Sequence, residues 1–313
     1  MTKKTNLLTV ALVATLALTA TTATLAQNQN RPKITSRLEI YDTATGERTL
    51  LKEYPYSIEA PNWTMDGNYL VYNSGGKIYK IEVSNPAGDT QVYTGAIAGS
   101  NNDHVLSFDG MGLAISASSA EVRGSRIYTL PIDGGTPRLV TPLAPSYLHG
   151  WSPDGKTLAY CAGRGDNMDV YTIPVRGGDE VRLTDAEGLD DGPEYSPDGR
   201  HIWFNSVRSG LMQVWRMNAD GSQQTQMTLD ETRNSWFPHV SPDGQKVLFI
   251  AYAKGDVEPG AHPGGKNVEL RLMSASGGDA ETVVKLFGGQ GSLNVNSWAP
   301  DSRRFAFVSY IWE

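Results

Sequence analysis

The sequence predicts an all-β protein, a six-bladed β-propeller with four antiparallel strands per blade. Three observations predict it. A turn motif recurs about every 44 residues, four short alternating segments fill most repeats, and the N-terminal segment can complete an unfinished last repeat.

The turn motif is clearest at residues 151–155, which read Trp-Ser-Pro-Asp-Gly. Proline pre-sets φ, aspartate tolerates the next turn position, and glycine supplies a positive φ where the chain enters the following strand. An alternating segment such as 156–160 follows, which is typical of a β-hairpin. One copy, at Asp109, is degenerate. We assign the other repeat aspartates to turn formation: Asp66, Asp154, Asp198, Asp243 and Asp301.

Each repeat continues with further strands. The predicted third strands lie at 77–81, 126–130, 169–173, 213–217 and 269–273, and the fourth strands at 91–93, 138–140, 181–183, 226–228 and 282–284. The sixth repeat has only two strands, 295–298 and 305–310. We expect residues 37–51, which form two strands around Thr45-Gly46, to supply its third and fourth strands, because this closes the ring and removes its open edges.

The composition excludes several classes of protein. The chain has 313 residues with 33 glycines and 17 prolines, as a turn-rich domain requires. Its single cysteine, Cys161, cannot form an internal disulfide and is expected to be a small buried apolar residue. The net charge of −7 and the absence of a Lys/Arg run argue against nucleic acid and anionic membranes as partners. We expect a monomer.

The N-terminus predicts export. Lys3 and Lys4 precede the apolar stretch 7–20, and Thr24-Leu25-Ala26 is a plausible cleavage site, so residues 1–26 are interpreted as a signal peptide. An uncleaved membrane anchor is the alternative, although the stretch is short and rich in threonine. We expect residues 27–36 to be a short linker, residues 37–313 to be the propeller, no membrane span in the mature chain, and a periplasmic or secreted location.

These repeats resemble the TolB-type propeller repeat, an aromatic-Ser-Pro-Asp-Gly turn followed by an Ile/Val-Tyr strand and a Gly-Gly turn. The match is seen in residues 151–155 with Val170-Tyr171 and Gly177-Gly178, and it extends over about residues 37–313. The resemblance implies a propeller used by envelope proteins, peptidase-associated domains and some polysaccharide lyases. The α/β domain that precedes the propeller in full TolB has no counterpart here, and no Gly-x-Ser-x-Gly motif indicates a serine hydrolase.

Polar side chains gather at the start of the innermost strands, which line the channel of a propeller. We expect His149, Glu194 and His239 to converge at one channel mouth on three successive blades, with His104 one blade further away. Two imidazoles and a carboxylate suit a divalent metal such as Zn²⁺ or Mn²⁺. Without a metal, a histidine could act as a general base. The alternative is structural, since a histidine beside a strand often only bonds a neighbouring carbonyl.

A second candidate feature is a loop of about 14 additional residues near 253–267. A long loop on a rigid scaffold can form a binding lid, or it can be a solvated excursion. Its His262 joins His149 and His239 as a predicted catalytic residue. The predicted substrate-binding residues include Trp236, whose ring could stack on a sugar, and the full set is Glu59, Asp191, Glu194, Trp236, Asn296 and Lys266.

Two functions follow from these patterns. The first is a non-catalytic binding module of the cell envelope, whose partner is a small molecule, an oligosaccharide or an envelope protein. The second is a metal-assisted carbohydrate-active enzyme, a lyase or a hydrolase, that uses the His/Glu cluster at the channel mouth. The resemblance extends to some oligogalacturonate lyases, which use a related propeller with a metal held by histidines.

Overall fold

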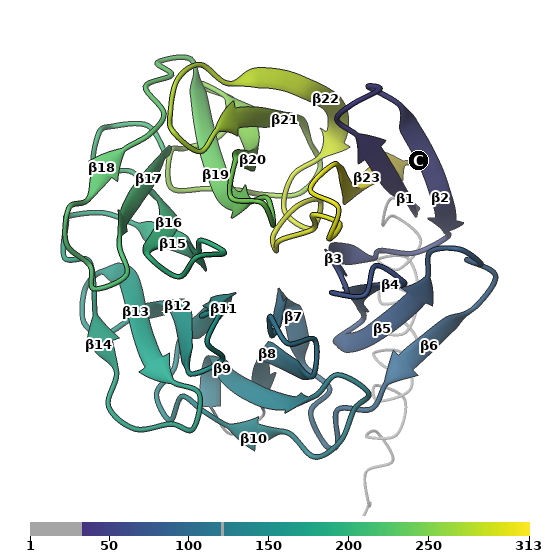
Figure 1. The fold of residues 1–313 in the computed structure, drawn as a ribbon, viewed down its shortest axis with the longest axis horizontal. Coiled ribbons are helices and arrows are strands. Elements are labelled where there is room, and N and C mark those ends of the chain that lie inside the picture. Colours follow the sequence, from purple (N-terminus) through teal and green to yellow (C-terminus); the bar gives the residue numbers. More distant parts are fainter. Residues whose placement is uncertain (1–32, 120–121) are drawn as a thin grey trace, which may run out of the picture.

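The computed structural model describes residues 33–119 and 122–313 and shows a ring of six β-sheets around a central axis (Figure 1). The predicted signal peptide, residues 1–26, and most of the predicted linker lie outside the described residues. The first strand begins at Ile34, three residues before the predicted start of the propeller. Within the described ranges, no helix has the length and hydropathy that a membrane crossing requires.

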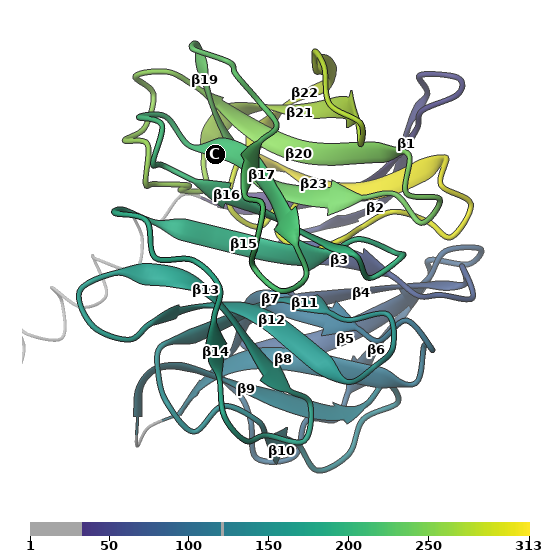
Figure 2. The same cartoon turned by 60° about the vertical axis from the view of Figure 1, so that its left-hand side comes forward.

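Five blades consist of four strands that follow one another in sequence from the channel to the rim, as predicted. In Figure 2 these blades are seen from the side, stacked around the ring. Blade one consists of β3 (Glu59–Trp63), β4 (Tyr69–Ser74), β5 (Lys77–Glu82) and β6 (Asp89–Val92). Blade two consists of β7 (Ser100–Leu106), β8 (Gly112–Ser119), β9 (Val122–Pro131) and β10 (Arg138–Leu139), and blade three of β11 (Ser146–Trp151), β12 (Thr157–Gly163), β13 (Met168–Pro174) and β14 (Val181–Arg182). Blade four consists of β15 (Asp190–Tyr195), β16 (His201–Ser206), β17 (Gln213–Asn218) and β18 (Thr225–Gln226), and blade five of β19 (Arg233–Val240), β20 (Lys246–Ala253), β21 (Lys266–Ser274) and β22 (Glu281–Gly288).

The sixth blade joins the two ends of the chain. β23 (Arg304–Trp312) pairs with β1 (Ile34–Asp42) over nine residues, and β1 pairs with β2 (Arg48–Tyr54) on its outer side. The innermost position is held by an irregular segment that meets β23 through one bridge, Trp298 to Phe305, and through the bond from Ala306 N to Ser297 O. The predicted closure by the N-terminal strands is therefore confirmed.

The repeat aspartates form the turns, as predicted. In blade three, Oδ1 of Asp154 accepts hydrogen bonds from Ser152 Oγ at 2.6 Å and from Lys156 N at 3.1 Å, and Gly155 has a φ of +72°. The bond from Ser152 is the main cause that lowers the pKa of Asp154 below its ordinary value. The same Ser/Thr-to-Asp contact recurs at Asp66, Asp109, Asp198 and Asp243.

A β-bulge interrupts the innermost strand of each of blades one to five. In three blades the bulge contains a residue with positive φ directly before a proline: Ala60, Gly192 and Phe237. A positive φ is costly for phenylalanine, about 1–3 kcal/mol, and Phe237 is held there by a 3.0 Å hydrogen bond from its N–H to Asn205 Oδ1. Bulges redirect side chains, and here they set the residues that face the channel.

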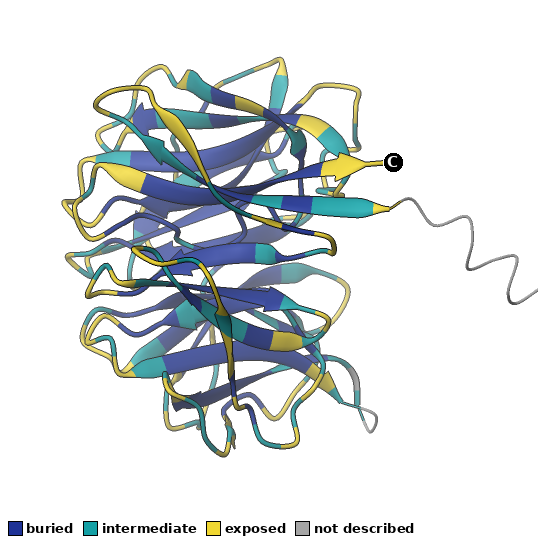
Figure 3. Cartoon of the chain, turned by 90° about the vertical axis from the view of Figure 1, so that its right-hand side faces the viewer, coloured by how far each residue is buried: buried dark blue, intermediate teal, exposed yellow. Residues whose placement is uncertain are grey.

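The core lies between the blades, where the second strands are almost entirely buried and the outer turns are exposed (Figure 3). Trp203, at 2% exposure, packs with the apolar residues of blade five, so it joins adjacent blades. Cys161 is also buried, and burial raises its pKa, which agrees with the predicted inert thiol.

Candidate functional site

A pocket of about 310 Å³ opens at the mouth of the channel where the innermost strands end in their turns; we call it the turn-side pocket. Aromatic residues at those strand ends form its wall, and Met65 and Phe108 form part of its half-exposed rim. The wall residues are Trp63, Trp151, Tyr195 and Trp298. Each of these aromatics directly precedes its turn motif, so the repeat itself brings them together.

The floor of the turn-side pocket is polar and joins four blades. Glu194 Oε2 lies 2.7 Å from His239 Nδ1, and Glu194 Oε1 accepts hydrogen bonds from Val240 N at 2.9 Å and from Asn296 Nδ2 at 2.7 Å. The side-chain amide of Asn62 donates in turn to the backbone carbonyl of Asn296. This network links blades four, five, six and one around the channel.

A second cluster lies deeper in the channel and consists of Asp103, His149, Asp191 and His262; we call it the histidine–aspartate cluster. His149 Nε2 is 3.2 Å from Asp191 Oδ1, and His262 Nε2 is 4.0 Å from Asp191 Oδ2. The imidazole of His149 stacks on Phe237 at 5.6 Å between ring centroids, two blades away. His149 therefore extends from blade three toward the centre of the ring.

The charges in this cluster depend on one another. Burial opposes the charged form of His149, but Asp191 and Asp103 outweigh it and raise the pKa above 6.5. Burial would raise the pKa of Asp191, yet His149 and His262 lower it below 3.8. Both shifts favour the imidazolium–carboxylate form of this pair. Asp103 differs, because burial raises its pKa to about 6.

The long loop covers this cluster. It joins β20 to β21 through residues 254–265, as predicted, and it is fixed by the 3.0 Å hydrogen bond from Tyr252 Oη to Pro263 O. The His262 ring lies 4.3 Å from the Trp236 ring and 5.1 Å from the Phe237 ring, between centroids. The anchored end of the loop is therefore packed against the inner strand of blade five.

The residues predicted to form one metal centre are divided between the two sites. Glu194 and His239 bond each other, whereas His149 pairs with Asp191, although His149 and Glu194 both line the turn-side pocket. Across residues 33–119 and 122–313, no group of three His, Cys, Asp or Glu side chains is arranged to hold a metal ion. The donor set does not fit the predicted Zn²⁺ or Mn²⁺ centre, because His149 pairs with Asp191 in the other cluster and within the described residues no third donor joins Glu194 and His239.

Other predicted site residues have distinct environments. Trp236 is fully buried in the core, with His262 over its ring, so the prediction that it stacks on a sugar is wrong for this closed arrangement. His104 of blade two is buried against Val71 O of blade one, and burial lowers its pKa to about 4. Asn73 donates to Glu59, whose pKa is raised by burial. Lys266 bonds Asp256 O at the base of the loop, away from both clusters.

Sequence reasoning places Asn62 and Asp103 among the polar positions at the channel but does not select them as site residues, and it does not single out Phe237. Asn62 and Asp103 both lie among the polar residues of the inner strands β3 and β7, which is a usable signal. Phe237 precedes a proline, as Ala60 and Gly192 do at the equivalent positions of their blades. The direction of its side chain depends on a positive φ, which the sequence does not reveal for a phenylalanine.

The fold, with a pocket at the end of its channel, is that of a β-propeller binding module. Residues 143–282 match the TolB beta propeller domain. An uncharacterized protein of Agrobacterium fabrum is 46% identical over 276 residues, which cover 88% of this chain and 92% of that protein. The chain belongs to the TolB-like β-propeller family.

A solved structure of a candidate TolB from Agrobacterium tumefaciens superposes with a TM-score of 0.84 at 46% identity, over 89% of this chain and 99% of that one. The Tol-Pal system protein TolB of Francisella tularensis is 26% identical over 214 residues, 66% of this chain and 48% of that protein. The match therefore spans about half the length of that TolB.

Proposed function

We propose that this protein is a periplasmic or secreted binding module of the cell envelope, and that its turn-side pocket binds a carbohydrate. One observation carries the proposal: an aromatic-walled pocket contains residues whose polar atoms have no hydrogen-bond partner within the described chain. These atoms are Asn62 Oδ1, His149 Nδ1 and Trp151 Nε1.

A sugar matches this arrangement in two ways. Its ring offers apolar faces that pack on aromatic side chains, and its hydroxyls both donate and accept hydrogen bonds. Asn62 Oδ1 can accept a hydrogen bond, Trp151 Nε1 can donate one, and His149 Nδ1 can do either according to its protonation; each lies buried beside the pocket with this capacity unused. Its volume of about 310 Å³ is at the lower end for ligand sites, which favours a single ring unit.

The envelope location is supported by the predicted signal peptide at residues 1–26 and by membership of a family that includes Tol-Pal system proteins. The match covers only about half of the Francisella TolB, so the proposal does not extend the Tol-Pal system to this chain. The proposal concerns the pocket alone.

Fluorescence titration of the pocket tryptophans with a panel of neutral mono- and disaccharides tests the proposal. Phe108→Ala removes an aromatic rim residue that is 36% exposed, and we expect at least a few-fold loss of affinity. Leu229→Ala, at a 79% exposed apolar residue outside the pocket, is the matched control. Absence of binding across the panel, or equal affinity in Phe108→Ala, would reject the carbohydrate ligand.

The alternative, a carbohydrate-active enzyme, has one observation in its favour. His149 lines the pocket, and Asp191, 3.2 Å away, raises the pKa of its imidazole against the opposing effect of burial, so it could deliver a proton to a bound sugar. The test is product analysis after incubation with the sugars that bind. Turnover that is lost in His149→Gln while binding persists would favour the enzyme.

A further inference from the structure

The repeat places a basic side chain at the same register in two blades. Lys80 of β5 pairs with Val71 of β4, and Arg216 of β17 pairs with Trp203 of β16. The two strands are otherwise aligned, since each begins three residues earlier at Lys77 and Gln213. In each case the basic side chain contacts the next blade, at the turn that follows the third strand of that next blade.

In blade one this basic group is neutralised by the next blade. Lys80 Nζ lies 2.8 Å from Asp133 Oδ1, in the turn after β9. That turn is defined by the hydrogen bonds from Ile132 N to Met111 O and from Gly134 N to Pro131 O. The pair shows what this register accommodates: a carboxylate at the junction between two blades.

Arg216 of blade four faces the matching turn of blade five, which has a serine instead. Ala275 N bonds Gln245 O and Gly277 N bonds Ser274 O, so Ser276 occupies the position that Asp133 has in blade two. Arg216 meets this turn only through a 3.3 Å hydrogen bond to Ala275 O. Among the residues that the structure describes, no carboxylate lies within ion-pair distance of the Arg216 guanidinium.

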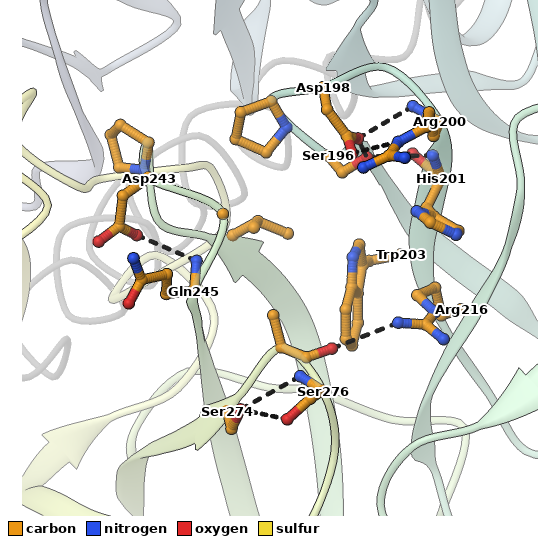
Figure 4. A pocket seen from close by; sticks show the side chains of 15 residues that line it. Ser196, Asp198, Arg200, His201, Trp203, Arg216, Asp243, Gln245, Ser274 and Ser276 are labelled. Carbon is orange, nitrogen blue, oxygen red and sulfur yellow. Dashed lines mark hydrogen bonds and ion pairs between the residues drawn. The ribbon is translucent and has the colours of Figure 1, made fainter.

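The guanidinium faces an open groove of about 830 Å³ between blades four and five (Figure 4). Figure 4 shows Trp203 in the middle of the groove, with His201 and Arg216 on one side and Ser274 and Ser276 at one end. The Arg216 guanidinium lies over the Trp203 ring, 5.5 Å from its centroid, which orients it.

The other charged groups of the groove are already engaged. Asp198 is bound by Arg200 at 2.6 Å, and Asp243 Oδ1 accepts hydrogen bonds from Ser241 Oγ and Gln245 N within its own turn. Burial is the main cause that lowers the pKa of His201, and the nearby charge of Arg216 lowers it further. Arg216 is therefore the basic group in the groove that no carboxylate neutralises within the described residues.

We propose that this groove binds the carboxylate of a small ligand, an organic acid or an acidic sugar, with Arg216 as its anchor and the hydroxyl of Ser274 as a further donor. The ligand carboxylate would make the contact that Asp133 makes with Lys80. Arginine suits this role because its planar fork can bind both oxygens of a carboxylate.

The groove continues toward the channel, since it shares Pro197, Val240 and Pro242 with the turn-side pocket. An acidic sugar could therefore lie along both sites. The carboxylate site itself does not rest on the carbohydrate proposal, because it follows from the comparison of Arg216 with Lys80.

The test is a two-dimensional ¹H–¹⁵N NMR titration with succinate, D-glucuronate and D-glucose. We expect succinate and D-glucuronate to shift the indole signal of Trp203. Arg216→Gln and Ser276→Asp should each weaken both acids by about tenfold or more, the first by removing the anchor and the second by providing an internal carboxylate. Ser276→Ala and Lys80→Gln should change affinity by less than about twofold, and thermal denaturation of each variant confirms folding.

The three probes distinguish the sources of the carboxylate. Equal binding of both acids indicates an organic acid site, and tighter binding of D-glucuronate than of succinate and D-glucose indicates an acidic sugar that extends into the turn-side pocket. Failure of both acids to bind, or undiminished binding in folded Arg216→Gln and Ser276→Asp, overturns the proposal. Neither result affects a neutral sugar bound in the turn-side pocket.

Discussion

Glu194 and His239 lie on neighbouring blades and are joined by a 2.7 Å contact between Oε2 and Nδ1. Both residues stand four positions before their turn aspartates, so the repeat brings them to the same level of the channel. The other carboxylate oxygen accepts from Val240 N and Asn296 Nδ2. One carboxylate thus connects blades four, five and six, and it serves as a structural centre as well as part of the pocket floor.

Replacing Glu194 tests this structural role. Glu194→Ala leaves three buried donors without an acceptor, and we expect the free energy of unfolding to fall by about 2–4 kcal/mol. Glu194→Gln keeps one acceptor oxygen and should lose about half as much. Urea denaturation measures both, with Glu281→Ala on the exposed surface of β22 as the control. Equal stability of Glu194→Ala and the control would contradict the role.

The blades were predictable because their signals are local. Each turn has an aspartate at the same position, which glycine follows in five of the six copies, and a fixed period then sets the number of strands. The same local rule placed the repeat aspartates correctly, as the bond from Ser152 to Asp154 shows. The closure by residues 37–51 followed from counting strands, although the innermost segment of blade six is less regular than the other five.

The candidate site was only partly predictable, because it depends on contacts between segments far apart in the chain. The equal offsets of Glu194 and His239 predicted their proximity correctly. The separate partner of His149 could not be predicted, since the bulge directs that side chain across the channel. Trp236 was predicted to lie at the channel mouth with its ring free to stack on a sugar, but His262 from the long loop covers that ring. Periodicity does not contain such long-range packing.

Ring closure can be tested with two leucines of one hairpin. Leu38 of β1 is fully buried, whereas Leu50 of β2 is 41% exposed. Leu38→Ala should lower the free energy of unfolding by about 2–5 kcal/mol, because it opens a cavity in the blade that joins the termini. Leu50→Ala should cost less than about 1 kcal/mol. Chemical denaturation that gives equal losses would show that the closing blade contributes little to stability.

The loop at residues 254–265 should depend on His262 for its position. His262→Ala removes the ring that packs on Trp236 and Phe237, and we expect faster amide hydrogen exchange across the loop and a stability loss of about 1 kcal/mol. Glu258→Ala, at the exposed tip, is the control and should exchange like the parent. Unchanged exchange in His262→Ala would show that the bond from Tyr252 to Pro263 holds the loop by itself.

Asp103 should make stability depend on pH. Burial is the main cause that raises its pKa from 3.8 to about 6; Asp191 and Glu59 add to the rise, and His149 and Asn101 oppose it. Because the folded pKa exceeds the unfolded one, the stabilising contribution is complete below about pH 3.8 and is lost as the pH rises through about 6. At pH 8 the folded protein therefore bears the cost of a buried charge.

Asp103→Asn removes this ionisation and keeps an acceptor for Asn101. We expect the variant to exceed the parent in free energy of unfolding by roughly 1–3 kcal/mol at pH 8, and the difference to disappear near pH 4. Urea denaturation at several pH values measures this, with Asp256→Asn in the exposed loop as a control that should show no such dependence. A parent protein at least as stable as Asp103→Asn at pH 8 would mean that the electrostatic effect of His149 outweighs the burial of Asp103.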